Sequence, residues 1–191
     1  VVFVGDYVVR KNCLIYYLIH GRYNSEFMPS SMDNFKAYAN YHGQRVGVLY
    51  WDTTGQEEFI NIRVLSYANT EIIVLVFKLT DKTTFENLFN IWIPEINDNI
   101  KKSPVFILVG VDFEEWFRDP YNKNYVSQEE IDLVSKYSYI HKVVKCSYKT
   151  GQNMDKMNTF LLVDDFLRVK YPKVYAKLKI KKSRPKYEID D

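Results

Sequence analysis

The apolar positions of the chain fall into short continuous runs and longer spaced runs, and the two kinds predict different elements. Continuous runs of roughly four to eight apolar residues are typical of strands buried on both faces of a sheet. Four segments have this form: Val1–Val4, Ile72–Leu79, Val105–Val109 and Val143–Cys146. We therefore expect each of them to be a buried strand.

A hairpin is predicted between the first two of these strands. Phe35–Tyr41 alternates between apolar and polar residues, the His42–Gln44 segment has the composition of a tight turn, and Arg45–Trp51 follows. Strands joined by so short a turn pair in antiparallel fashion. The hairpin therefore adds an antiparallel edge to the sheet.

Segments with helical spacing separate the strands. Asn12–His20 is an apolar helix candidate with Gly21 as its stop, and Ser127–Glu130 resembles a capping box that opens another helix. Thr83–Ile91 and Met154–Val169 also have the spacing of helices. We expect these helices to connect the strands.

The alternation of strands and helices predicts an α/β protein. Its sheet is expected to be mostly parallel, with helices on both faces and the hairpin at one edge. Ligands of such sheets bind beyond the carboxyl ends of the strands. Candidate chemistry is therefore sought in the segments that follow Val4, Trp51, Val109 and Cys146.

Composition restricts the class of protein. The 191 residues suffice for one domain, and 47% hydrophobic with 26% charged residues excludes a disordered chain, a collagen and a disulfide-stapled miniprotein. No apolar run approaches the roughly 20 residues that span a bilayer. Cys13 and Cys146 match neither a disulfide framework nor a zinc pattern, which indicates a reduced, cytoplasmic setting.

The net charge of +2 conceals an uneven distribution. Lys and Arg are concentrated after residue 167, whereas the rest of the chain is mildly acidic. We expect a domain at 1–169 and a basic tail at 170–191. The tail would give weak contact with an anionic inner membrane surface, and a solvated, disordered tail is the alternative. Nucleic acid is not expected as a partner, because the domain itself is acidic.

The segment Gly5–Asn12 follows the first strand and fits half of a phosphate-binding loop. Against the pattern G-x-x-x-x-G-K-S/T, Gly5 and Lys11 match, whereas Arg10 and Asn12 do not. Such a lysine reaches the β- and γ-phosphates, and the Arg10 guanidinium is also able to bind phosphate. Taken alone, the segment is compatible with an ordinary strand-to-helix turn.

The segment after the hairpin is more specific. Asp52-Thr53-Thr54-Gly55-Gln56-Glu57 resembles the D-T-A-G-Q-E motif of Ras-superfamily small GTPases, with Thr54 in place of alanine. Other segments resemble the Rho/Rac family at matching spacing: Pro29–Phe35 (switch I), Leu65–Tyr67, Phe85–Leu88, Trp92–Ile96 and Cys146-Ser147. The resemblance covers residues 1–170 and implies the three-layer, six-stranded fold of P-loop NTPases.

The resemblance implies a nucleotide site at the strand ends. Gln56 takes the position of the glutamine that orients the attacking water, although by itself it is compatible with an exposed loop residue. Glu114 takes the position of the aspartate that reads guanine, with one more methylene. The implied nucleotide-binding residues are Gly5, Lys11, Asn12, Cys13, Tyr23, Ser30, Gly55, Glu114 and Ser147. The implied metal ligands are Asn12, Ser30 and Asp52, and the implied effector-binding residues are Met32, Asp33, Asn34 and Phe35.

The chain departs from the family at the phosphate, metal and base positions. Arg10 replaces a phosphate-loop glycine, and Tyr7 replaces another at which bulk would obstruct a partner's arginine finger. Asn12 replaces the Mg²⁺-ligating hydroxyl, and an amide on a longer arm is a poorer ligand. Asp112 replaces the lysine that packs on the base and adds negative charge there. Tyr148 stands where a small residue is expected.

Two functions remain open. The first is a divergent Rho-like switch that binds GTP or GDP with Mg²⁺, both weakened, and recruits effectors and exchange factors in cytoskeletal regulation. Hydrolysis would then be attack of a Gln56-oriented water on the γ-phosphate, with Lys11 and Mg²⁺ holding the charge. The second is a pseudo-GTPase, an interaction module that works without nucleotide. Changes at three subsites together favour impaired nucleotide handling.

Overall fold

The structure, a computed structural model, describes residues 1–26, 34–56 and 59–182. Within these ranges the strands are β1 (Val2–Val4), β2 (Asn34–Tyr41), β3 (Gln44–Asp52), β4 (Ile72–Lys78), β5 (Val105–Val111) and β6 (Ile140–Lys145). They form one six-stranded sheet in the order β2-β3-β1-β4-β5-β6. β2 is antiparallel to β3 and the other neighbouring pairs are parallel. The predicted fold class is confirmed.

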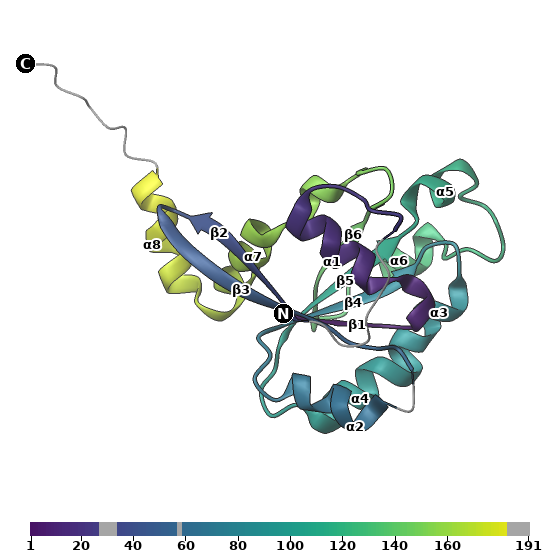
Figure 1. Ribbon diagram of the computed structural model, residues 1–191, viewed down its shortest axis with the longest axis horizontal. Helices are drawn as coiled ribbons and strands as arrows, with labels where there is room; N and C mark the ends of the chain where they lie inside the picture. The colour runs from purple at the N-terminus through teal and green to yellow at the C-terminus, as the bar shows by residue number, and fades with distance from the viewer. Residues whose placement is uncertain (27–33, 57–58, 183–191) are drawn as a thin grey trace, which may run out of the picture.

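Helices cover both faces of the sheet (Figure 1). The helical elements are η1 (Tyr7–Val9), α1 (Lys11–His20), α2 (Ile60–Arg63), η3 (Val64–Tyr67), α3 (Lys82–Asn87), η4 (Leu88–Trp92), α4 (Ile93–Asn99), α5 (Phe113–Arg118), α6 (Gln128–Val134), η5 (Met154–Lys156), α7 (Thr159–Lys170) and α8 (Pro172–Lys182). Leu14 of α1 and Leu162 of α7 lie in one hydrophobic core. Phe85 of α3, Ile96 of α4 and Ile131 of α6 lie in a second core, on the other face.

The central strands follow the predicted pattern closely. All residues of β5 and all but the last of β4 are buried, because both faces of these strands are covered by helices. The hairpin turn also forms as predicted: His42 and Gly43 have φ values of 51° and 82°. Positive φ at both central residues is the conformation that matches the twist of a two-residue hairpin.

Two predicted helices have different limits in the structure. The run predicted at Met154–Val169 is divided into η5 and α7, because the Asn158 side chain caps α7 by accepting a hydrogen bond from the Leu161 N–H at 2.9 Å. The helix predicted at Thr83–Ile91 continues as η4 and α4. Pro94 is the second residue of α4, which follows directly on η4, a π-helical turn.

The first part of the predicted basic tail forms α8. Tyr175 donates a hydrogen bond to Asp164 in α7 at 3.0 Å, and Tyr41 of β2 donates to the same carboxylate at 2.9 Å. Residues 172–182 are therefore helical and attached to the domain, which differs from a wholly disordered tail; residues 183–191 lie outside the described ranges. None of the described helices is long and apolar enough to cross a membrane.

A buried arginine anchors the segment that follows β3. Arg63 of α2 is 2% exposed, and its Nε and Nη2 donate to the two carboxylate oxygens of Glu95 in α4, at 2.9 and 2.5 Å. Its Nη1 donates to the carbonyl oxygens of Thr54 and Gln56, at 3.0 and 2.9 Å. Tyr67 donates to Glu95 at 2.7 Å. The loop that carries Gln56 is thus tied through Arg63 to α4.

We predict that Glu95→Gln lowers the free energy of unfolding by about 3 kcal/mol, because it leaves the Arg63 guanidinium buried without its counter-charge. Chemical denaturation monitored by circular dichroism measures this value. The matched control is Glu86→Gln, since Glu86 is exposed on α3 and its replacement should change stability by less than about 0.5 kcal/mol. Equal effects of the two substitutions would contradict the anchoring role of Arg63.

Candidate functional site

The backbone of the predicted phosphate loop has the course that a glycine-rich loop requires. Gly5 has a φ of +147°, and a Cβ atom there would lie 2.2 Å from the carbonyl oxygen of Val76. Arg10, in the second glycine position, has φ 54° and ψ 55°, the left-handed conformation that costs an ordinary residue roughly 1–2 kcal/mol. The loop therefore keeps its shape although Arg10 carries a side chain.

Lys11 is the buried cation of this loop. It is 4% exposed, and its Nζ donates to the carbonyl oxygens of Gly5 and Asp6 at 2.6 and 3.2 Å. Burial lowers the pKa of Lys11 to about 8, and the negative charge of Asp52 acts in the opposite direction. A cation held at the start of a ten-residue helix is suited to a phosphate, because the N-terminus of a helix attracts anions.

Asn12 lies beside Lys11 in the first turn of α1. It is 6% exposed, and its Nδ2 has no hydrogen-bond partner among the described residues. A buried amide that is left unpaired costs free energy. The Nδ2 donor is suited to a phosphate oxygen, whereas only the Oδ1 atom of the same amide could ligate Mg²⁺, which takes oxygen ligands. The unpaired donor of Asn12 therefore fits a phosphate.

The Asp6 side chain attaches the phosphate loop to neighbouring helical elements. Its carboxylate accepts hydrogen bonds from Asn87 Nδ2 at 2.8 Å and from Trp92 Nε1 at 2.6 Å. These bonds join the loop to α3 and η4. The sequence pattern did not single out this role, because Asp6 lies 81 and 86 positions before its two partners and nothing local marks them as partners.

Gly55 brings the segment after β3 directly onto the phosphate loop. A Cβ atom on Gly55 would lie 2.3 Å from the backbone nitrogen of Tyr7 and 2.7 Å from the carbonyl oxygen of Gly5. A residue with a side chain does not fit here unless one of the two segments moves. The structure thus brings together two segments that the resemblance assigned to the phosphates.

Gln56 is exposed next to this contact, and Thr54 holds it. The buried Thr54 hydroxyl accepts a hydrogen bond from the Gln56 N–H at 3.2 Å and donates to Gln56 Oε1 at 3.3 Å. An alanine at position 54 would make neither bond. Thr54 therefore occupies the amide oxygen with which this glutamine would accept a hydrogen bond from water.

The negative charge that Asp112 was expected to add on the base side is compensated by two lysines. Asp112 is 4% exposed, and its carboxylate lies 2.9 Å from Lys149 Nζ and 3.4 Å from Lys78 Nζ. The Asp112 ion pair raises the pKa of Lys149 although burial acts against this. Lys149 thus supplies a positive charge close to the position of the missing lysine.

The remaining base-side residues gather around the start of α5. Glu114 Oε1 lies 3.9 Å from Lys149 Nζ, and its Oε2 is buried with no hydrogen-bond partner in the described ranges. Ser147 is buried, and its Oγ accepts a hydrogen bond from the Thr150 N–H at 3.1 Å. Within the described residues, Glu114 Oε2 is therefore available to accept a hydrogen bond. A carboxylate that reads the N–H groups of a base needs such an oxygen.

The structure describes only part of the predicted effector-binding and metal-ligand residues. Ser30, Met32 and Asp33 lie outside the described ranges. Asn34 is exposed and Phe35 half-buried at the start of β2, where Asn34 pairs with Trp51 of β3. The predicted effector-binding and metal positions that fall in residues 27–33 thus remain predictions.

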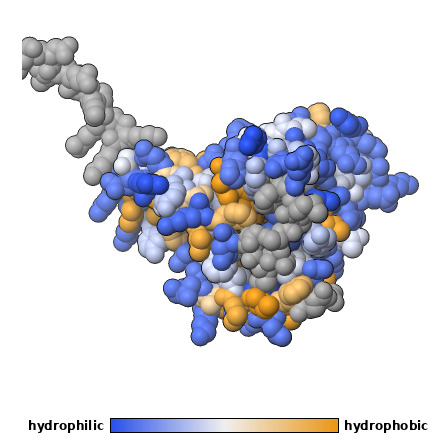
Figure 2. Space-filling view, in the orientation of Figure 1, coloured by the Kyte–Doolittle hydropathy of each residue, from blue (hydrophilic) through white to orange (hydrophobic). Residues whose placement is uncertain are grey.

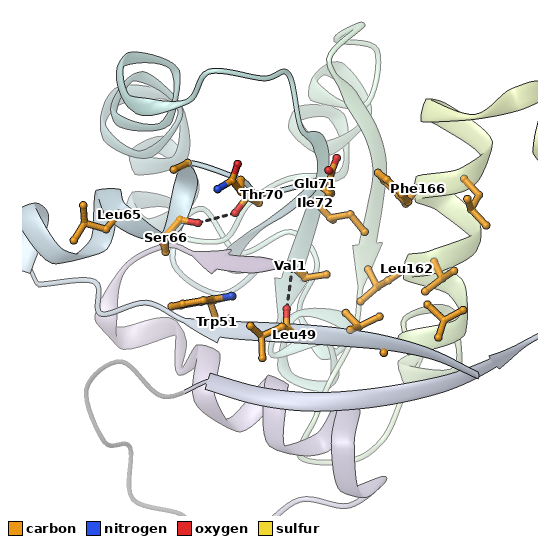
Figure 3. Close-up of a pocket in the computed structure, with 17 residues that line it drawn as sticks. Val1, Leu49, Trp51, Leu65, Ser66, Thr70, Glu71, Ile72, Leu162 and Phe166 are labelled. Carbon is orange, nitrogen blue, oxygen red and sulfur yellow. Dashed lines mark hydrogen bonds between the residues drawn. The ribbon is translucent and has the colours of Figure 1, made fainter. Parts of the chain in front are cut away.

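An apolar pocket of about 670 Å³ lies at the opposite end of β1 (Figure 3). Trp51 and Leu49 of β3, Leu65 of η3, and Leu162 and Phe166 of α7 are among its lining residues. It opens at the amino end of β1, whereas the phosphate loop follows the carboxyl end of that strand. The pocket is therefore separate from the candidate nucleotide site.

Comparison with known proteins gives one family. The family model described as "Ras family" matches residues 1–164. The chain is also similar to "GTP-binding protein rho2" of Schizosaccharomyces pombe (strain 972 / ATCC 24843), with 33% identity over 163 residues, which is 81% of this chain and 80% of that protein. The family-model match spans the phosphate loop, the segment after β3 and the base-side loops together. The chain belongs to the Ras family of small GTPases, as a Rho-like member.

Proposed function

We propose that this Rho-like protein binds guanine nucleotide weakly, mainly through its phosphates, and signals by recruiting effector proteins through its switch segments. The observation that carries this proposal is Lys11, a buried cation bonded to the carbonyls of Gly5 and Asp6 at the N-terminus of α1. A phosphate would place a negative charge against this cation. The left-handed backbone at Arg10 and the close approach of Gly5 to Val76 give the loop the course of a glycine-rich loop, which supports the same proposal.

Magnesium contributes less here than in a site with a hydroxyl ligand. When bound, Mg²⁺ would neutralise phosphate charge, with Asn12 and Asp52 as its ligands from the described residues and Ser30 as the third predicted ligand. The Nδ2 group of Asn12 has no partner within residues 1–26, 34–56 and 59–182, so a direct bond from this N–H to a phosphate oxygen would replace part of what the metal supplies.

The partner surface lies next to the Gln56 segment. Ile60, Ile62 and Leu65 of α2 and η3 are exposed apolar residues. The space-filling view shows an apolar region over this part of the molecule (Figure 2). Such a region, together with the predicted effector residues Asn34 and Phe35 at the start of β2, supports contact with effectors and exchange factors, and cytoskeletal regulation is the process that we propose.

The basic end of the chain supports a second contact. Lys173 and Lys177 are exposed on α8, and further Lys and Arg residues follow. Because each such residue near an anionic bilayer gains about 1 kcal/mol, this end of the chain gives weak, salt-dependent attraction to the inner membrane surface.

A nucleotide-independent pseudo-GTPase is the second candidate function. Specific contacts favour it: Lys11 already has two carbonyl partners, Gly55 rests on the loop backbone, and Asp112 is neutralised by Lys149. The site is thus stabilised by the protein's own groups. A titration with nucleotide separates the two functions.

For the proposed function, fluorescent GDP and GTP should bind the purified protein in the micromolar range, with little change when Mg²⁺ is removed by a chelator. Arg10→Gly combined with Asn12→Thr should tighten binding by at least about tenfold and make it depend on Mg²⁺, since both substitutions restore family contacts. If neither protein binds at high micromolar nucleotide, the proposed nucleotide binding is refuted and the pseudo-GTPase function is supported.

The buried charge of Lys11 predicts a pH dependence of stability. The unfolded chain keeps this proton up to a pKa near 10.4, whereas the folded protein releases it above its pKa of about 8. Folding is therefore opposed by the charged form, and the free energy of unfolding should rise with pH above 8. Relative to Lys11→Met, we expect a gain of about 2 kcal/mol between pH 7 and 9.5 in chemical denaturation. A constant difference over this range would contradict the burial of a charged Lys11.

The contact between Thr54 and Gln56 predicts a change in GTP hydrolysis. Thr54→Ala frees the Gln56 amide oxygen, and one such hydrogen bond, at about 1 kcal/mol, corresponds to roughly fivefold faster single-turnover hydrolysis. Thr54→Ser keeps the hydroxyl and should match the unsubstituted protein. If both substitutions leave the rate unchanged, Thr54 does not restrain Gln56.

A further inference from the structure

Tyr148 has an unexpected place in the loop after β6. This loop is closed by hydrogen bonds from the Ser147 N–H to the Gln152 carbonyl and from the Gly151 N–H to the Ser147 carbonyl, both at 2.9 Å. Tyr148 within it is only 3% exposed. A tyrosine in a loop is normally half-exposed, so the loop directs this ring into the protein.

The ring of Tyr148 lies among residues assigned to the nucleotide. It packs on Tyr23 with ring centroids 5.8 Å apart and planes tilted by 38°, and it belongs to the same hydrophobic core as Cys13. Burial raises the pKa of Tyr148, the nearby charge of Asp112 raises it further, and Arg10 acts in the opposite direction. In the family these positions surround the base and ribose: Tyr23 flanks the base, and Asp112 replaces the lysine that packs on it.

We infer that Tyr148 fills the base subsite with its own ring, so that the site selects ligands by their phosphate chain and not by their base. This inference rests on the proposed phosphate binding of Lys11. It makes Tyr148 the residue that determines specificity: pyrophosphate, GDP and ADP present the same diphosphate, and the base of either nucleotide adds little.

The contacts of the base side agree with this assignment. Entry of a base requires the Tyr148 ring to leave a position in which it is almost fully buried, and exposing a large apolar side chain costs about tenfold to a hundredfold in an equilibrium constant. The substituent at the lysine position, Asp112, is paired with Lys149 and has no stem to cover a base.

Glu114 determines which base the site would prefer once the Tyr148 ring is removed. Its Oε2 is buried and unpaired in the described part of the chain, and a carboxylate oxygen accepts hydrogen bonds only. Guanine offers N–H donors on the edge that such a carboxylate reads, whereas the corresponding edge of adenine has no matching pair of donors. Truncation of Tyr148 should therefore uncover a preference for guanine.

Isothermal titration with three probes, inorganic pyrophosphate, GDP and ADP, tests the inference. For the unsubstituted protein we expect the three dissociation constants to agree within about threefold. In Tyr148→Ala, GDP should bind at least about tenfold more tightly than pyrophosphate and ADP. Tyr148→Phe keeps the ring and should behave as the unsubstituted protein, and Tyr121→Ala removes a fully exposed tyrosine as a matched control.

The outcomes separate this inference from the function on which it rests. GDP binding more than about tenfold tighter than pyrophosphate in the unsubstituted protein overturns the role of Tyr148, and this comparison holds even if Tyr148→Ala fails to fold. Unchanged ratios in a folded Tyr148→Ala also overturn it. Absence of binding for pyrophosphate and both nucleotides refutes the phosphate site itself, and the inference with it.

Discussion

The ammonium group of Lys11 is buried at the carboxyl end of β1, and the arrangement of the site depends on how it is held. Its bonds to the carbonyls of Gly5 and Asp6 fix the loop around the cation, and the Asp6 carboxylate ties the same loop to Asn87 and Trp92. Gly55 rests on the loop from the other side. A charge removed from water needs such partners, or a ligand of opposite charge, to remain in place.

Three departures from the family are accompanied by a contact within the protein. Lys149 neutralises Asp112, Tyr23 packs on Tyr148, and the Thr54 hydroxyl bonds Gln56. The phosphate position keeps an unsatisfied donor, since Asn12 Nδ2 has no partner in the described residues. The changes are therefore uneven: the base side is filled by the protein, whereas the phosphate side remains suited to an anion.

The sequence predicted those parts of the fold that local patterns determine. The apolar runs located β4 and β5, the turn at His42 and Gly43 located the hairpin, and Ser127 with Glu130 forms the predicted capping box. Each of these signals depends on residues only a few positions apart, whose spacing alone reports the local geometry.

The contacts that the sequence did not predict join residues far apart in the chain. Asp112 meets Lys149, Tyr23 meets Tyr148, and Arg63 meets Glu95, and the two partners of each pair lie at least 32 positions apart in the chain. The motif comparison located the phosphate loop and the base-side loops, but the partner of each substituted residue follows only from the folded arrangement.

The central claim is that phosphate recognition persists while the base subsite is occupied by the protein. Amide hydrogen exchange read by mass spectrometry, with saturating pyrophosphate and with saturating GDP, tests it most directly. The account predicts slower exchange in residues 5–14 with either ligand, and no additional protection of residues 147–152 with GDP. Protection of 147–152 by GDP alone, or no protection of 5–14 by either ligand, would contradict it.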